Sequence, residues 1–444
     1  MSLLIGKFAS IIIYDNQFSK NIILNKLKTV KTKLFFLASL AFSLFCKAQN
    51  VTIPDADFKS YLVNNSAINT NGDSQIQVSE AVAFTGTIDC SSKNIASLTG
   101  LEAFVNLTKL SCFGNLLTSL DVTKNTALTS IVCAGNQLKT LDVTKNLALT
   151  ELNIHNNQIT TLDVSKNTLL SFLSFSDNLV TAIDLTKNTA LASLVCENNV
   201  LTTLDVGKNT QLTNLDCGYN QFTSLSLKNN AVLEQLTVNN NPLVTLDLTG
   251  NSSLVILNSI GTAFTSIDLS KNTALLALDF SNGKLTNLDV SKVQMLELLV
   301  ASNNQLTSVN LKNGNNAGIF YLDLTGNSNL GCIQVDNVED ANENTALEYW
   351  MKDETSTYNT NCNSTLGVND ISKNDVKIFP NPTSSIVNWS MTADVEVYNT
   401  VAQRILISKK SSSVDLSKFS DGVYVVILKN KDGKEIQRSK IIKK

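Results

Sequence analysis

Side chains able to do chemistry are sparse in this sequence of 444 residues. A catalytic serine or cysteine needs a neighbouring base, and His155 is the only histidine in the chain. Phosphate-binding loops, zinc signatures and dinucleotide fingerprints do not occur. One array of carboxylates does stand out, because aspartates recur at multiples of 21 residues, at positions 121, 142, 163, 184, 205, 247, 268 and 289. A residue type tied to one place in a regular unit reflects the geometry of that unit, so we predict no enzyme active site.

One segment has the spacing of a metal site. Residues 69–80 place oxygen-bearing side chains where a calcium-binding EF-hand loop has them, with Asn69, Asn71, Asp73 and Glu80 at loop positions 1, 3, 5 and 12. The match has two departures: Asn69 replaces the usual aspartate, and Ser74 stands where glycine normally makes the turn. The alternatives are a calcium site and a polar loop that needs no metal. Apart from calcium, we expect no cofactor.

The N-terminal segment, residues 1–48, reads as an export signal. Basic residues between Lys26 and Lys33 precede an apolar run from Leu34 to Phe45, and Cys46-Lys-Ala48 follows as a cleavage pattern. We expect cleavage after Ala48, and an upstream start codon assigned too early explains the residues before the basic stretch. A lipoprotein based on Cys46 is disfavoured because Phe45 stands where a small residue is required. No later segment reaches the length of a membrane span.

Composition narrows the class of protein further. Hydrophobic residues make up 43% of the chain, which is enough for a large core. The formal net charge of −3 argues against nucleic acid as a partner. With only four prolines and 18 glycines, the chain has little room for long flexible linkers.

The strongest signal is an internal repeat of 21 residues. Ten leucines start successive copies without a slip, at positions 107, 128, 149, 170, 191, 212, 233, 254, 275 and 296. Counting each leucine as position 1, apolar residues stand at positions 4 and 6, which is the alternation of a short strand. Asparagine at position 9 is suited to satisfying buried backbone groups, and the aspartates at position 15 are suited to capping a helical turn. With one further copy at each end, the sequence predicts about twelve coils.

This template resembles the leucine-rich-repeat family in its short bacterial form. The resemblance covers residues 85–335 and implies a solenoid with one parallel β-sheet along one face. A single coil buries too little apolar surface to offset its conformational entropy, so the array needs caps. We expect the N-terminal cap in residues 49–84 and the C-terminal cap in residues 336–366.

Apart from Cys46 in the export signal, the cysteines fall into two groups. Cys332 and Cys362 flank an acidic segment at the C-terminal cap, and in an exported protein such a leftover pair predicts a disulfide. The other repeat cysteines all stand at position 6, an inward strand position, where we expect small buried hydrophobic groups. Their spacings of 21 and 22 residues match no zinc site. This second group consists of Cys90, Cys112, Cys133, Cys196 and Cys217.

Residues 367–444 form a linker and a separate module. Alternating apolar residues and turn residues predict a small C-terminal all-β sandwich. Its motifs resemble the type A C-terminal sorting domain of the type IX secretion system, and they are carried by Pro380, Asn381, Pro382, Tyr398, Asn399, Gly422, Tyr424 and Lys440. The resemblance implies a Gram-negative host, the type IX secretion machinery as partner, and removal of this domain after export, near residue 370. The exported part is then released or fixed to the cell surface.

Two function classes fit this organisation. The first is an extracellular module that binds or adheres to a protein or glycan, and the second is a structural spacer of the cell surface without a specific ligand. An enzyme is disfavoured because no remaining segment is long enough for a catalytic domain. A spacer should carry bland polar residues on every strand, whereas a binder should break the pattern locally.

The outward strand positions, 3, 5 and 7, contain one such break. Position 3 reads Ile256, Ala277, Leu298 and Tyr321 in four successive coils, and Ile260 and Val300 stand beside them. Stacked side chains of this kind would form an exposed apolar patch, which is typical of interaction sites. The alternative is that β-branched and aromatic residues merely favour strands. Asp279 and Asp323 interrupt the stripe.

Overall fold

The computed structural model describes residues 49–362, 376–400 and 403–444. The chain divides into two compact units between residues 363 and 364, and each unit has its own hydrophobic core. The predicted cleavage after Ala48 and the predicted end of the mature chain near residue 370 lie outside the described residues.

The first unit begins with two short helices, α2 (Ala56–Val63) and α3 (Val78–Ala83). Helix α2 buries Phe58 and Leu62 completely against the first coil. The carboxylate of Asp55 caps this helix by accepting hydrogen bonds from the backbone N–H groups of residues 57 and 58. Its other oxygen accepts from residues 96 and 97 in the first coil, at 2.8 and 3.0 Å. One side chain therefore joins the cap to the solenoid.

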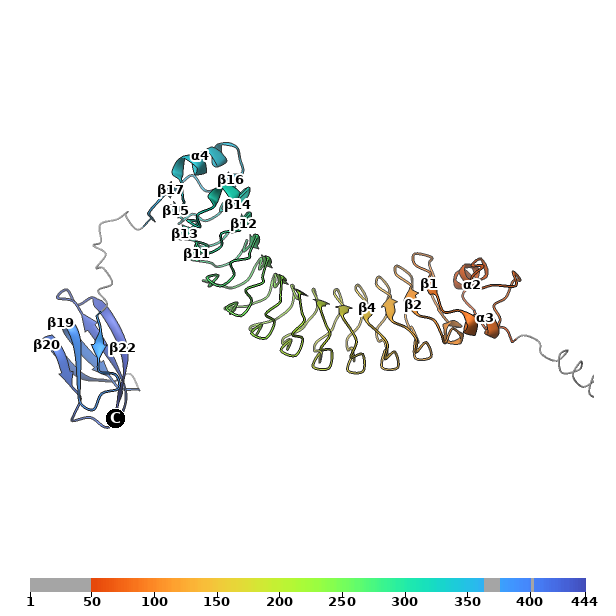
Figure 1. Ribbon diagram of the computed structural model, residues 1–444, viewed down its shortest axis with the longest axis horizontal. Coiled ribbons are helices and arrows are strands. Elements are labelled where there is room, and N and C mark those ends of the chain that lie inside the picture. Colours follow the sequence, from red (N-terminus) through yellow and green to blue (C-terminus); the bar gives the residue numbers. More distant parts are fainter. Residues whose placement is uncertain (1–48, 363–375, 401–402) are drawn as a thin grey trace, which may run out of the picture. The chain divides into compact units, whose positions relative to one another are not determined.

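The solenoid is lined by one parallel sheet of 13 strands, which follows the inner side of the curve in Figure 1. Twelve strands come from the predicted repeats, and the segment after the repeats adds the thirteenth, β16. In order across the sheet they are β1 (Thr87–Asp89), β2 (Lys109–Ser111), β3 (Ser130–Val132), β4 (Glu151–Asn153), β5 (Phe172–Ser174), β6 (Ser193–Val195), β7 (Asn214–Asp216), β8 (Gln235–Thr237), β9 (Ile256–Asn258), β10 (Ala277–Asp279), β12 (Leu298–Val300), β14 (Tyr321–Asp323) and β16 (Trp350–Met351).

Each coil turns away from its strand through a left-handed residue at position 8. This residue has φ between +49° and +72° in twelve successive coils. Glycine, asparagine and aspartate adopt this conformation at low cost, and they occupy all but two of these places. Tyr219 is the bulkiest exception, with φ of +49°. The residues are Ser92, Gly114, Gly135, Asn156, Asp177, Asn198, Tyr219, Asn240, Gly261, Asn282, Asn303 and Gly326.

The asparagine at position 9 ties neighbouring coils together. In a typical coil, the amide nitrogen of Asn178 donates to the backbone carbonyls of Ile154, Phe175 and Ser176, each at 3.0 Å. Its amide oxygen accepts from the backbone N–H of Ile159 at 2.8 Å. All these groups are buried, so the side chain satisfies four backbone polar groups that water cannot reach. The predicted role of position 9 is confirmed in this coil.

A second row of asparagines stands at position 19 and is fully buried. The amide nitrogen of Asn146 donates to the carbonyls of Val122 and Asn125 in the preceding coil, at 3.0 and 2.9 Å. The amide oxygen has no hydrogen-bond partner in eight coils. This row therefore links coils through its donors alone. Its members are Asn125, Asn146, Asn167, Asn188, Asn209, Asn230, Asn251 and Asn272.

The aspartates at position 15 shape the outer side of the coil. Asp142 is exposed, and one of its oxygens accepts from the backbone N–H and the hydroxyl of Thr144, at 2.8 and 2.7 Å. The predicted helical turn was wrong here: the segment is a hydrogen-bonded turn, closed by the bond from Asn146 N to the Val143 carbonyl at 3.0 Å. Coil geometry thus accounts for the aspartate array.

From the tenth coil onward the opposite side of the solenoid forms strands as well. A second parallel sheet contains β11 (Asn287–Asp289), β13 (Ser308–Asn310), β15 (Cys332–Gln334) and β17 (Thr357–Asn359). Helix α4 (Val338–Ala346) lies in the segment between β15 and β16. The end of the repeat array therefore continues both sheets, and Trp350 is buried there with its indole N–H bonded to the Ile319 carbonyl at 2.8 Å.

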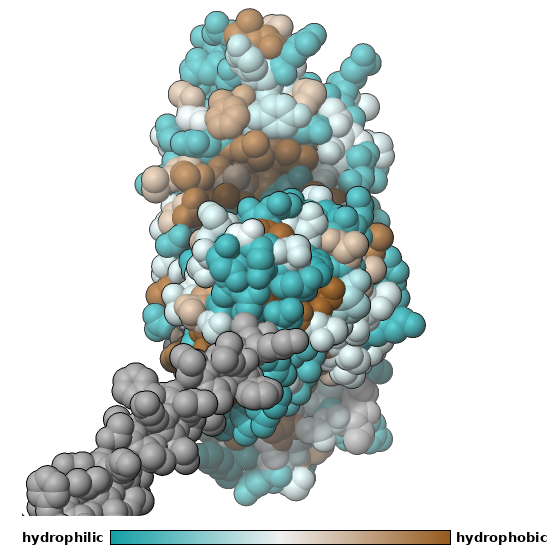
Figure 2. Space-filling view, turned by 90° about the vertical axis from the view of Figure 1, so that its right-hand side faces the viewer, coloured by the Kyte–Doolittle hydropathy of each residue, from teal (hydrophilic) through white to brown (hydrophobic). Residues whose placement is uncertain are grey.

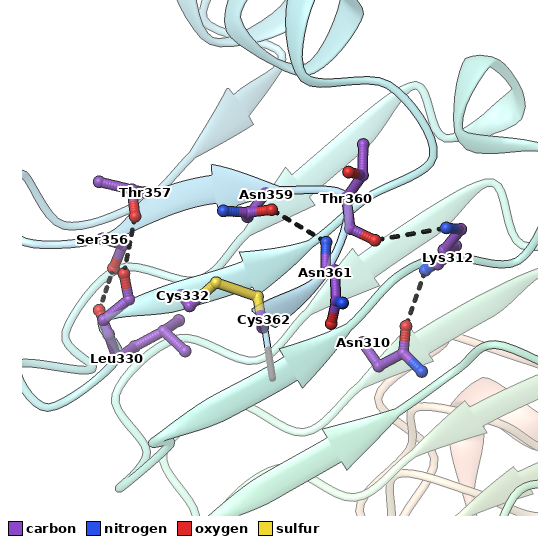
Figure 3. Close-up of a disulfide and its surroundings, with 11 residues drawn as sticks. Asn310, Lys312, Leu330, Cys332, Ser356, Thr357, Asn359, Thr360, Asn361 and Cys362 are labelled. Carbon is purple, nitrogen blue, oxygen red and sulfur yellow. Dashed lines mark hydrogen bonds between the residues drawn. A yellow bond between two sulfur atoms is a disulfide. The ribbon is translucent and has the colours of Figure 1, made fainter. Parts of the chain in front are cut away.

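A disulfide between Cys332 and Cys362 closes this end, and it joins the pair predicted from the sequence. Figure 3 shows that the bridge connects β15 to the stretch that follows β17. In the same place, the ammonium group of Lys312 donates to the carbonyl of Thr360 at 3.3 Å. These contacts hold the last described residues of the unit against the second sheet.

The five cysteines at position 6 are free and buried. Burial raises the pKa of the Cys90 thiol to about 12. A thiol must ionise before it reacts, so these groups are inert in the folded protein. We expect an alkylating reagent to modify none of the five in the native exported protein and all five after denaturation. Cys332 and Cys362 should react only after reduction. Mass spectrometry checks this, and an alkylated Cys332 without reduction would contradict the pairing.

The second unit is an antiparallel sheet of five strands. They are β18 (Ile378–Phe379), β19 (Ile386–Tyr398), β20 (Arg404–Asp415), β21 (Gly422–Lys429) and β22 (Glu435–Lys443). The central strand β19 pairs with β18, β20 and β21, and its register with β20 shifts at several points. Such irregularities bend a strand, which lets the sheet enclose a core around Val387, Trp389 and Val426.

Candidate binding surface

The predicted apolar residues do lie together on the inner sheet. The strand register places Ile256 beside Ala277, Ala277 beside Leu298, and Leu298 beside Tyr321. The intervening residues of these strands, such as Leu299, are fully buried, so the aligned side chains point to the opposite, open face. Each of the aligned residues is partly buried. We call this row, with Ile260 and Val300 beside it, the apolar stripe.

The C-terminal cap extends the stripe by one strand. Strand β16 pairs with β14 so that Trp350 lies beside Leu322 and Met351 beside Asp323. Tyr349 therefore stands next to Tyr321, and it is exposed. Sequence reasoning missed Tyr349 and Met351 because they lie beyond the last repeat. Figure 2 shows apolar side chains gathered in a band in the upper part of the view.

The inner face also carries acidic groups. Between β4 and β14, the outward positions carry carboxylates in five coils and no lysine or arginine. The outer side of the coils differs, because its aspartates at position 15 alternate with lysines at position 18, such as Lys145 and Lys166. The inner carboxylates are Glu151, Glu197, Asp216, Asp279 and Asp323.

Two of these carboxyl groups are held in an unfavourable setting. Burial, with a smaller contribution from neighbouring Asp216 and Asp177, raises the pKa of Glu197. Burial also raises the pKa of Asp216 above its ordinary value of 3.8, and one backbone N–H at Gly218 only partly offsets it. The ionised forms are therefore disfavoured in the folded protein.

We predict that Asp216→Asn raises the melting temperature at neutral pH. The penalty for ionised Asp216 exists above its folded pKa and disappears below 3.8, where the carboxyl is protonated in both states. The amide keeps the hydrogen bond to Gly218. Melting curves of both proteins should thus separate at pH 7 and converge at about pH 3. Equal melting temperatures at both pH values would contradict the assignment.

His155 lies on the same face but forms no catalytic arrangement within the described residues. Its Nδ1 is 3.2 Å from a carboxylate oxygen of Asp177 in the next coil, and its side chain is 45% exposed. All five repeat cysteines are buried, and burial raises the pKa of the Cys196 and Cys217 thiols, so none is available to it as a nucleophile. His155 is therefore a surface histidine.

The EF-hand-like loop closes through its own hydrogen bonds. Both oxygens of Glu80 are used: one accepts from the backbone N–H groups of Thr70 and Asn71, and the other accepts from Gln77 N at 3.0 Å. The amide nitrogen of Asn69 donates to the Asp73 carbonyl at 2.7 Å and to the Val63 carbonyl at 2.9 Å. A donor thus points where an EF-hand has an oxygen ligand. The turn comes early, at Gly72 with φ of +69°, whereas an EF-hand makes it at loop position 6.

This geometry supports the polar loop over the calcium site. We expect a chelator such as EDTA to leave the melting temperature of the exported protein unchanged, because amide donors already satisfy Glu80. Thermal unfolding with EDTA and with millimolar calcium checks this. A melting temperature that rises on adding calcium and falls on chelation would restore the calcium site.

The motif residues of the second unit converge on strand β22. The side chain of Asn381 donates to the Lys440 carbonyl at 2.7 Å and accepts from Ile442 N at 2.9 Å. Pro380 and Pro382 flank this asparagine. Tyr424 is buried, and its hydroxyl donates to the Ser420 carbonyl at 2.6 Å.

Of the remaining motif residues, Tyr398 contacts Glu396. The hydroxyl of Tyr398 donates to this carboxylate at 2.7 Å, and Arg404 and Lys429 pair with it. Asn399 accepts from Gln403 N at 2.9 Å, and Gly422 begins β21.

Both units contain segments that match known protein families. Residues 377–444 match the secretion system C-terminal sorting domain, and residues 72–178 match the leucine-rich-repeat domain of the endo-beta-N-acetylglucosaminidase EndoS. This chain is a leucine-rich-repeat protein with a C-terminal sorting domain. The sorting domain marks this leucine-rich-repeat protein as secreted or exposed on the cell surface, and it implies the type IX secretion machinery as a partner.

Solved structures support the solenoid fold. An internalin, InlF, from Listeria monocytogenes is 19% identical, with 71% of this chain and 94% of that chain covered and a TM-score of 0.52. A TDR receptor is 22% identical, with 59% and 52% covered and a TM-score of 0.51. No curated protein matches the sequence. Across the described residues, this leucine-rich-repeat protein has no helix long and apolar enough to cross a bilayer.

Proposed function

We propose that this protein is an exported binding module that holds a protein or glycan ligand on its inner sheet, without catalysing a reaction. The observation that carries the proposal is the apolar stripe. Its side chains come from adjacent strands in register, so Ile256, Leu298 and Tyr321 form one continuous surface on the open face. Contiguous apolar surface of this kind is characteristic of interaction sites.

The repeat pattern is broken where the stripe begins, which favours a binder over a spacer. The asparagine at position 9 is replaced by Thr262 and Gly283 in the coils of β9 and β10. Thr262 bonds only to the carbonyl of Ser259, at 2.9 Å. In a spacer without a ligand, we expect the asparagine at position 9 to be kept in the coils that expose apolar side chains.

The arrangement of polar groups supports a non-catalytic role. The inner carboxylates come from separate coils, and His155 faces Asp177 at an exposed place rather than a nucleophile. The matching family model covers the repeat domain of EndoS. An adhesive or ligand-binding role therefore accounts for the surface with the fewest further assumptions.

The test uses the exported protein on arrays of glycans and of extracellular proteins. We expect specific binding that is lost in the double variant Leu298→Asp with Tyr321→Ser. The matched control is Leu147→Asp with Leu169→Ser, because both of these leucines are exposed at the ends of coils, away from the strands. Blank arrays, or binding that the stripe variant retains while folded, would overturn the proposal and favour the spacer.

A further inference from the structure

The inner face combines two kinds of surface within the same few strands. Strand register places Val300 directly between Asp279 and Asp323. Leu298 and Tyr321 stand two residues before Val300 and Asp323 on the same strands. A ligand that covers the stripe must therefore meet both apolar groups and carboxylates.

The two carboxylates are held in place by their own strands. One oxygen of Asp279 accepts from Ser281 N at 2.9 Å, and one oxygen of Asp323 accepts from the N–H and hydroxyl of Thr325, at 2.9 and 2.7 Å. No lysine or arginine stands at an outward position of any described strand from β4 to β14. The negative charge of this face is therefore left for a partner to neutralise.

Resting on the proposed function, we propose that the ligand of the stripe is a protein segment that presents apolar side chains and lysine or arginine on the same face. An acidic partner would bring like charges together without compensation. The aliphatic groups of Ile256, Leu298 and Val300 offer a sugar no hydrogen bond, and covering them with hydroxyls would leave those hydroxyls unsatisfied. An amphipathic basic segment satisfies both parts of the surface.

The size of the surface sets the length of this segment. The stripe crosses the five adjacent strands β9, β10, β12, β14 and β16. Four steps of about 4.8 Å give a length of about 19 Å, which an extended chain of about six residues covers at about 3.3 Å per residue. Tyr349 and Met351 form the end of the stripe at β16.

The experiment uses labelled peptides of eight residues with the exported protein. In the first peptide every second residue is leucine or lysine in turn, with serine between them, so that leucine and lysine share one face. In the second peptide glutamate replaces lysine, and in the third serine replaces leucine. Fluorescence anisotropy at low and at high salt gives each dissociation constant. We expect the leucine–lysine peptide to bind at least about tenfold more tightly than either of the others.

The decisive variant is Asp279→Asn with Asp323→Asn, which keeps the local hydrogen bonds and removes the charge. We expect it to weaken binding of the leucine–lysine peptide by about tenfold and to reduce the salt dependence. Its matched control is Asp142→Asn with Asp163→Asn on the outer side, because these aspartates accept the same kinds of bonds from Thr144 and Ser165. The control should bind like the unmodified protein.

The outcomes separate this inference from the function on which it rests. Equal binding of the glutamate and lysine peptides, or full affinity in the Asp279→Asn, Asp323→Asn variant, would overturn the basic partner. A glycan retained on the arrays and lost with Leu298→Asp, Tyr321→Ser, while no peptide binds, would overturn the protein partner and leave the binding function standing. Blank arrays together with absent peptide binding would remove both.

Discussion

Deleting residues 377–444 should remove nearly all of this protein from the cell surface and the medium. The sorting domain has its own core around Val387, Trp389 and Val426, separate from that of the solenoid. Without the sorting domain, the repeat unit should therefore fold but remain in the periplasm. Immunoblots of cell fractions from the deletion strain measure this directly.

Two controls separate a lost signal from misfolding. The retained protein should keep the circular dichroism and protease resistance of the exported form. Fusing residues 363–444 to an unrelated periplasmic reporter should carry that reporter out of the cell. Extracellular protein at the normal level after the deletion would show that the sorting domain is not the export signal.

Asn178→Ala is expected to destabilise the solenoid by roughly 3–5 kcal/mol, because it leaves several buried backbone groups without partners. The amide of Asn178 satisfies three carbonyls and one N–H across two coils. Alanine satisfies none of them. Urea unfolding followed by circular dichroism gives the free energy difference.

The control for Asn178→Ala is Asn229→Ala. The side chain of Asn229 is exposed and makes a single bond, to the Gly207 carbonyl at 3.0 Å. Loss of an exposed bond of this kind should change stability by less than about 0.5 kcal/mol. If both variants unfolded at the same urea concentration, the asparagines at position 9 would not be what holds the coils together.

The 21-residue period allowed the inner sheet to be predicted in detail. Because side chains alternate along a strand, assigning Ile131 and Cys133 to the interior fixed which neighbours face outward. Both are fully buried, as expected. The stripe residues from Ile256 to Tyr321 were located by the same reasoning, and their neighbour relations follow from the register.

The left-handed turn at position 8 was not predicted from the sequence, although residue types that favour it fill most of these places. Position 8 is left-handed in every coil, yet it holds Gly135, Asn156, Asp177 and Tyr219 in turn, so no single residue type marks it. The turn near Asp142 was taken for a helix because an aspartate cap suits both structures.

At the two ends of the solenoid, the positions of Tyr349 and of the Asn69 amide were not predicted, for a different reason. Strand β16 follows no repeat, so nothing in the period indicated that Tyr349 would join the stripe. In the loop of residues 69–80, EF-hand spacing is present, but only the structure shows that the Asn69 amide nitrogen faces the Asp73 carbonyl. Spacing alone does not reveal which atom of an amide points inward.

Hydroxyl-radical footprinting of the exported protein with the tightest ligand from the arrays locates the binding surface. Oxidation of Tyr321, Tyr349 and Met351 should fall several-fold when the ligand is bound. The reference is Met295, which is exposed at the end of a coil outside the strands and should react at the same rate with and without ligand. Protection of Met295 with unchanged oxidation of the three stripe residues would show that the ligand binds elsewhere, and it would contradict the assignment of the inner face as the binding surface.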